Sequence, residues 1–172
     1  MSVYHWLRFL RLIHIYAAIV LVGSIVFNTI VLMPALKRIP PAHAAVMGQR
    51  VGSGLMWLGG TAIALLGVSG FFRLWLLDDF GNLFSIQALL EPRLRWIATM
   101  AGSWLILAIT ATASAIWYRT VLNAKLPYSV GLRELEARRV ALERLSWWQD
   151  WLTYVNFSLA LLAALGGIMG TF

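Results

Sequence analysis

The feature that most constrains this chain is an apolar run over residues 13–36, which has no charged residue between Arg11 and Lys37. About 20 apolar residues in a helix, at roughly 1.5 Å each, cover the ~30 Å hydrocarbon core of a bilayer. The run is longer than the apolar part of a signal peptide, about 7–15 residues, so we expect a retained membrane span. Pro34 and the Pro40–Pro41 pair are expected to stop this helix.

Three further apolar runs follow, and the four runs together take up most of the 172 residues. Hydrophobic residues make up 60% of the sequence and charged residues 12%, whereas a soluble domain carries about 25% charged residues. Lipid is therefore expected to cover most of the folded surface. The sequence predicts an all-α integral membrane protein, a four-helix up-down bundle that forms one membrane domain over residues 1–172. The expected transmembrane helices are residues 12–36, 51–77, 96–118 and 152–172.

The longest polar segment lies between the third and fourth apolar runs and has the pattern of an amphipathic helix. Its leucines are spaced three and seven residues apart, which places them on one helix face. They are Leu132, Leu135, Leu142 and Leu145. Oppositely charged residues four apart lie on the other side, as in Glu134 with Arg138. This pattern predicts one interfacial amphipathic helix over about residues 130–148, lying along the membrane surface.

The net charge of +7 comes from lysines and arginines that mostly flank the apolar runs or lie in the amphipathic segment. This distribution favours anchoring in a bilayer with anionic lipid over nucleic-acid binding. The N-terminal flank and second loop carry five of these residues, and the first and third loops carry nine. The excess of positive charge predicts that the first and third loops are cytoplasmic and that both termini lie outside, in the cytoplasmic (inner) membrane.

Residue types that carry common catalytic chemistry are missing from the expected spans. All seven acidic residues lie outside them, and the chain has no cysteine. Paired carboxylates within the bundle, cysteine nucleophiles and thiolate metal sites are therefore not expected. The sequence gives no reason to expect an enzyme.

His14 is the strongest candidate for a binding residue. An ionisable side chain within a membrane span is costly and usually faces the bundle interior with a partner. Its neighbours at helical spacing include Ala17, Leu21 and Asn28, and such a face suits packing against protein or a cofactor. The competing interpretation is a histidine near the lipid headgroups that is hydrogen-bonded to a neighbouring helix. His5 and His43 are expected to be ordinary interfacial or loop residues.

Alternating spans bring Met100 and Met169 to the depth of His14, together with arginines that end or begin other spans. One imidazole and two thioethers suit Cu(I), a soft ion, so we take His14, Met100 and Met169 as candidate metal ligands. Methionine also fills gaps in apolar cores, and that alternative stays open for both. Only one histidine lies within a span, so a b-type haem would have a His/Met pair or a single axial ligand.

Short motifs in the first two spans resemble a known family. His14 followed by Gly23 and Pro34 resembles the opening helix of the copper-resistance D (CopD) family, and more distantly that of the HemJ-type protoporphyrinogen oxidases. Val68-Ser69-Gly70 resembles the Thr-Gly step of the second helix, and Arg95 stands where these families often place a lysine. The resemblance implies a four-span membrane protein that handles copper or, in some relatives, binds haem, with His14 as the residue that carries over.

Three functions therefore remain open. The first is CopD-like copper handling or binding with His14 as a ligand. The second is a non-catalytic accessory subunit of a larger membrane complex, which glycine-rich helices and nine tryptophans would suit. The third is a b-type haem-binding redox protein. The expected partners are the lipid bilayer and other membrane protein subunits, without nucleic acid.

Overall fold

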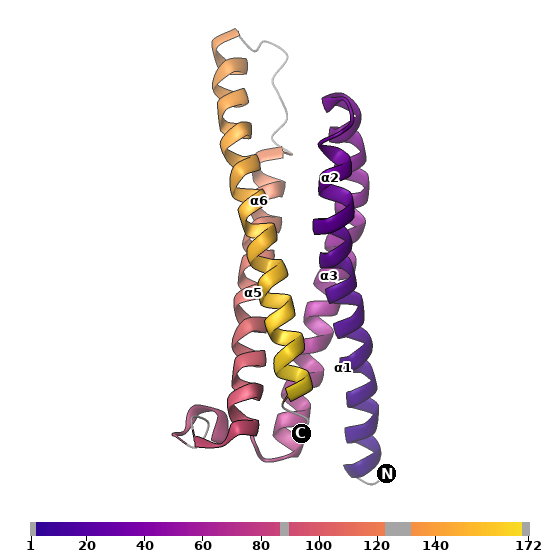
Figure 1. The fold of residues 1–172 in the computed structure, drawn as a ribbon, viewed down its shortest axis with the longest axis vertical. Helices are drawn as coiled ribbons and strands as arrows, with labels where there is room; N and C mark the ends of the chain where they lie inside the picture. The colour runs from indigo at the N-terminus through magenta and orange to yellow at the C-terminus, as the bar shows by residue number, and fades with distance from the viewer. Residues whose placement is uncertain (1–2, 87–89, 123–131, 170–172) are drawn as a thin grey trace.

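The computed structural model describes residues 3–86, 90–122 and 132–169 of the chain, and most of these residues are helical. Four helical segments run alternately up and down along one long axis (Figure 1). All four are long and apolar enough to cross a membrane: Val3–Leu36, Arg50–Leu76, Pro92–Ile116 and Asp150–Met169. The predicted all-α class is confirmed, and so are four helices with the length and apolar composition of membrane spans.

The first segment begins at Val3, well before the predicted residue 12, and consists of three helical pieces. They are α1 (Val3–Val26), the wider π-helix η1 (Phe27–Leu32) and α2 (Met33–Leu36). The Met33 N–H donates to the carbonyl of Asn28, five residues earlier. Pro34 lies within α2, so the expectation that it stops the helix was wrong. In a regular α-helix its ring would clash with the carbonyl of Ile30, and the wider π turn relieves this clash.

The second and third long helices are α3 (Pro41–Leu76) and α5 (Pro92–Leu122). Asp78 ends α3 by taking a left-handed conformation with φ of 58°. The following N–H of Asp79 then donates back to the carbonyl of Leu74, a standard way of closing a helix C-terminus. A 3₁₀ turn, η2 (Asn82–Phe84), follows, and Arg93 at the start of α5 pairs with Asp79 at 3.0 Å.

The last helix, α6 (Leu132–Met169), corrects the prediction of a separate interfacial helix over residues 130–148. Residues 132–148 are helical, but they continue directly into the fourth span and extend along the long axis of the bundle (Figure 1). Residues 130 and 131 lie outside the described part. The helix is continuous because neither glycine nor proline occurs between Leu132 and Asn156, so nothing interrupts its backbone hydrogen bonds.

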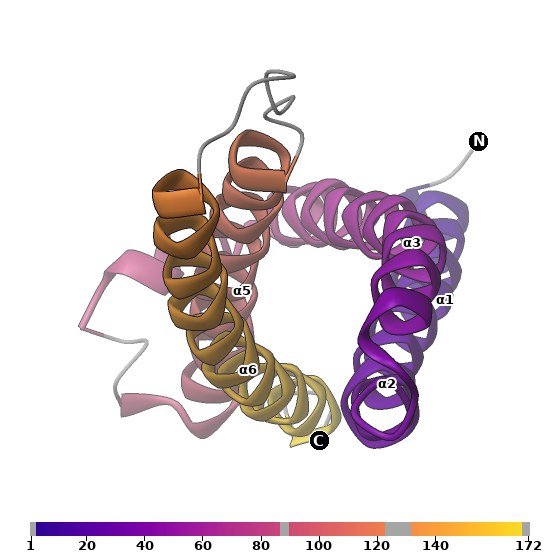
Figure 2. The ribbon, with the colours of Figure 1, turned by 90° about the horizontal axis from the view of Figure 1, so that it is seen from above.

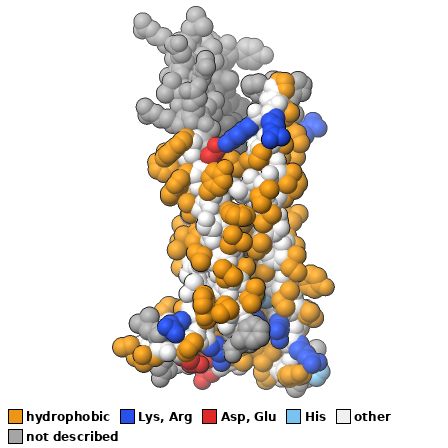
Figure 3. All heavy atoms as spheres, viewed as in Figure 1, with side chains coloured by type: hydrophobic (Ala, Val, Ile, Leu, Met, Phe, Trp, Pro, Cys, Tyr) orange, Lys and Arg blue, Asp and Glu red, His pale blue; other side chains and the backbone are white. Residues whose placement is uncertain are grey.

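The bundle is built from two helix pairs, α1 with α3 and α5 with α6, which pack more extensively within each pair than between them (Figure 2). A small core of Leu21, Ala62, Leu107 and Ala160 joins the pairs. No more than 17% of the most apolar window of any span is buried, and apolar side chains cover the outside between charged ends (Figure 3). This surface is compatible with lipid, which would remove the exposed apolar area from water.

Candidate functional site

His14 of α1 faces α3, where it contacts the Ser69-Gly70 step of that helix. Its Nδ1 lies 2.9 Å from the hydroxyl oxygen of Ser69, whose side chain is 1% exposed. The imidazole also lies over Gly70, where an added β-carbon would be 3.4 Å from Cε1 of the ring. The histidine of the first span and the Ser-Gly step of the second therefore form one structural unit.

The hydrogen bonds of Ser69 define which ring nitrogen of His14 is left available. The Ser69 hydroxyl donates to the carbonyl of Leu65 at 2.6 Å. A hydroxyl has a single proton, so its oxygen accepts from the Nδ1–H of the neutral imidazole. In this tautomer Nε2 carries the lone pair, which is the arrangement of a histidine whose second nitrogen serves as a ligand.

Two arginines lie one helical turn from this contact. Because α1 and α3 are antiparallel neighbours, Arg11, three residues before His14, lies alongside Arg73, four residues after Ser69. The Arg73 guanidinium interacts electrostatically with both His14 and Arg11, and its side chain is half-buried. In the described part of the chain, the ion pairs are Lys37–Asp150 and Arg93–Asp79, so neither arginine is paired with a carboxylate.

The two methionines proposed as metal ligands have surroundings of their own. Met100 packs against α6, where its sulfur would lie 3.4 Å from a β-carbon at Gly167. Met169 is 47% exposed at the end of α6. The contacts of His14, in contrast, are with α3. No group of three or more His, Cys, Asp or Glu side chains suited to a metal ion occurs among the residues described, and the three-ligand copper site stays a prediction.

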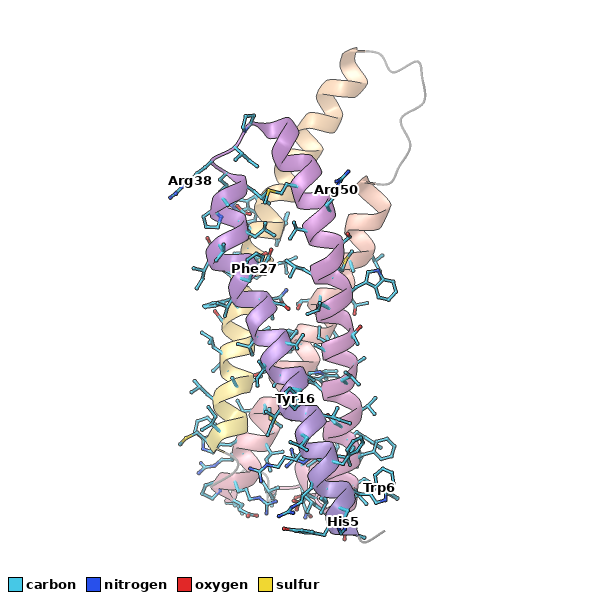
Figure 4. All side chains as sticks on the ribbon, turned by 90° about the vertical axis from the view of Figure 1, so that its right-hand side faces the viewer. His5, Trp6, Tyr16, Phe27, Arg38 and Arg50 are labelled. Atoms are coloured by element: carbon cyan, nitrogen blue, oxygen red, sulfur yellow. The ribbon has the colours of Figure 1, made fainter. Side chains whose placement is uncertain are left out.

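Charged and aromatic residues mark the two ends of the bundle. His5 and Trp6 lie at one end of the first segment, and Arg38 and Arg50 at the opposite end (Figure 4). His5 is exposed there, as an interfacial residue would be. The side chain of His43 lies outside the described part. The beginning of α1 and the end of α6 lie at the same end of the bundle (Figure 1), whereas the side of the membrane that this end faces stays a prediction.

Sequence reasoning missed a second candidate site, a cavity of about 1100 Å³ between the two helix pairs. Asn28 of η1 and Asn156 of α6 both line it. Asparagine within an expected span is a usable signal, since a polar amide in hydrocarbon is costly without a partner. The signal was incomplete because the sequence did not predict which helices pack loosely.

The chain matches no known family model, and no curated protein or solved structure is significantly similar to it.

Proposed function

We propose that this protein is a CopD-like membrane protein that binds a redox metal group through Nε2 of His14, and that this group is a b-type haem. The observation that carries the proposal is the Ser69 hydrogen bond to Nδ1 of His14. A ligating histidine almost always donates its other ring N–H to a protein acceptor, which sets its tautomer and ring orientation. Ser69 fulfils this requirement at a buried position of α3.

The charges around His14 favour haem over a bare copper ion. Arg73 and Arg11 add positive charge beside the imidazole, with no carboxylate paired to either in the residues described. Positive charge in a low-dielectric region opposes the entry of Cu(I), because like charges repel more strongly there than in water. A haem instead carries propionate carboxylates, with which arginine forms charge-assisted hydrogen bonds.

The placement of Met100 also weakens the copper alternative. Cu(I) would need thioethers beside the imidazole, whereas the sulfur of Met100 is directed towards Gly167 of α6. A haem needs only one or two axial ligands from the protein. When bound, it would supply a redox-active iron. The residues of this chain would ligate that iron through His14 and position the carboxylates through the arginines.

The test is a visible spectrum combined with elemental analysis of natively purified protein, comparing wild type with His14→Ala. His5→Ala is the matched control, since it removes a histidine from the exposed end of the same helix. We expect a Soret band and about one iron per chain in wild type and in the control, and loss of both in His14→Ala. Ser69→Ala should lower the affinity for haem about 10- to 100-fold, as removal of a hydrogen-bond partner of a ligating histidine typically does.

Two results would refute this proposal. Copper that is bound without a Soret band and lost in His14→Ala would keep His14 as a ligand but replace haem by copper. Absence of both iron and copper from correctly folded protein would remove the metal function altogether. The accessory-subunit hypothesis would then be the one left to test, by native electrophoresis of a mild detergent extract.

A further inference from the structure

The cavity between the two helix pairs is open towards the lipid-facing surface. Trp57 of α3 and Ile116 of α5 both line it, and they are 74% and 59% exposed. The α3 and α5 helices pack less extensively than the helices within each pair. A molecule that enters between them would come from the bilayer, so the occupant is expected to be soluble in the membrane.

An occupant of this cavity would gain dispersion contacts with its walls. At about 1100 Å³, the cavity is slightly larger than the range of about 300–1,000 Å³ seen for small-molecule sites. Lipid chains could restore the apolar contacts. They could not satisfy a polar amide, whose burial without a hydrogen bond is costly.

Asn28 is such an amide. Its side chain is half-buried and lines the cavity, and no hydrogen bond joins it to another residue in the described part of the chain. It lies in the six-residue π-helix Phe27–Leu32.

The remaining polar groups of the cavity define which kind of hydrogen-bonding group the occupant must bring. Asn156 accepts a hydrogen bond from the Thr110 hydroxyl through Oδ1, at 2.6 Å, which leaves its amide N–H groups as donors. Ser24 and Thr61 each donate to a carbonyl of their own helix. Asn28 and Asn156 therefore both offer amide N–H donors to an occupant, and Asn28 also offers its Oδ1 as an acceptor. The elements that carry them, η1 and α6, are in contact.

The charges of the cavity favour a neutral occupant. Its charged lining residues are Lys37 and Asp150, which form an ion pair with each other at 2.8 Å. No unpaired charge is thus left among these lining residues to bind an ionic group. A neutral, apolar molecule with hydrogen-bond acceptors therefore fits the paired charges and the amide donors of this lining.

We propose that this cavity binds a neutral, membrane-soluble molecule of the quinone class, whose carbonyl oxygens accept hydrogen bonds from the side-chain amides of Asn28 and Asn156. A quinone combines carbonyl acceptors with an apolar body, which matches the donors and walls of the cavity. The ester carbonyls of a phospholipid are the competing source of the same acceptor chemistry. The proposal is independent of haem binding at His14.

Native mass spectrometry of the full chain in detergent tests this, because it counts bound quinone and bound phospholipid in one spectrum. The probes are decylubiquinone and dioleoylphosphatidylcholine, added separately and together. We expect one decylubiquinone per chain, which displaces the phospholipid. Asn28→Leu keeps a similar volume without the amide, and should weaken quinone binding about three- to tenfold, as loss of one neutral hydrogen bond does. Ser24→Ala is its control, since the Ser24 hydroxyl proton is already used within α1.

A second variant fills the cavity. Gly59 lines it, and a β-carbon placed there has no atom within 4 Å, so Gly59→Leu should fold and abolish quinone binding. Gly102→Leu is the matched control, because Gly102 is equally open and lies outside the cavity lining. The proposal is overturned if Asn28→Leu or Gly59→Leu binds decylubiquinone as tightly as wild type. It is also overturned if phosphatidylcholine stays bound in the presence of excess quinone.

Discussion

Gly166→Ala provides the sharpest test of the helix packing. A β-carbon at Gly166 would lie 2.9 Å from the carbonyl oxygen of Trp96 and 3.1 Å from the backbone nitrogen of Met100. Both atoms belong to the backbone of α5, so no side-chain rotation can relieve the contact. The two helices would have to separate by several tenths of an ångström along their shared interface. Small residues allow this kind of close backbone approach in membrane helix pairs.

Two opposing effects determine how much Gly166→Ala changes the free energy of unfolding. Overpacking of a well-filled interface costs about 1–3 kcal/mol, whereas replacing glycine by alanine within a helix gains about 0.5–1 kcal/mol. Gly102→Ala on α5 isolates the second effect, since nothing lies within 4 Å of its added β-carbon. The difference between the two variants should therefore be about 1–3 kcal/mol, with Gly166→Ala the less stable.

Thermal unfolding in one detergent, followed by tryptophan fluorescence, measures this difference. For a chain of this length, about 1 kcal/mol shifts Tm by roughly 2–4 °C. Gly166→Ala should thus melt about 2–12 °C below Gly102→Ala. Equal melting temperatures for the two variants would refute the close approach of α5 and α6 at Gly166.

Three further predictions concern other contacts between helices. Gly67→Ala would place a β-carbon 2.5 Å from the Trp104 indole. The indole N–H donates to the carbonyl of Ile63 at 3.1 Å. Displacing the indole should lower the free energy of unfolding by about 1–3 kcal/mol, measured by thermal unfolding. Thr110→Val removes the hydrogen bond to Asn156 and should cost about 0.6 kcal/mol, at most ~1.7, in the same assay. The hydrogen bond to Asp150 and its negative charge raise the pKa of Lys37. The Lys37–Asp150 pair should contribute at most about 1 kcal/mol to the free energy of unfolding at this exposed site. This contribution should be fully present below the usual lysine pKa and should be lost as the pH rises through the raised pKa of Lys37. A pH series of melting temperatures for wild type and Lys37→Met, which lacks this dependence, measures it.

The four long apolar helices could be predicted because hydropathy over about 20 residues is a strong signal that does not depend on tertiary packing. Helix ends were harder, since amphiphilic turns extend a helix beyond its apolar part. Val3 to Leu12 is an example, because its residues form helix without being continuously apolar. The same reason explains residues 132–148, whose amphipathic pattern fits a surface helix and an extension of a span equally well.

The candidate sites could be predicted only in part, because they depend on which helix faces meet. His14 was identifiable as an ionisable residue in a span, and Ser69 was identifiable only through the resemblance. Their hydrogen bond requires the register of α1 against α3, which the sequence pattern does not contain. The π-helix at Phe27–Leu32 is equally hidden, since Pro34 could have ended the helix instead of widening the turn before it.

The two candidate sites use different parts of the same first segment, and this separation makes them independently testable. His14 and Asn28 are fourteen residues apart, which is about 21 Å along a helix and most of the ~30 Å hydrocarbon core. Substitutions more than about 7–10 Å apart without shared partners usually act additively. The partners of His14 are on α3, and Asn156, the second amide, is on α6. Asn28→Leu should therefore leave a metal group at His14 unchanged, and His14→Ala should leave quinone binding unchanged.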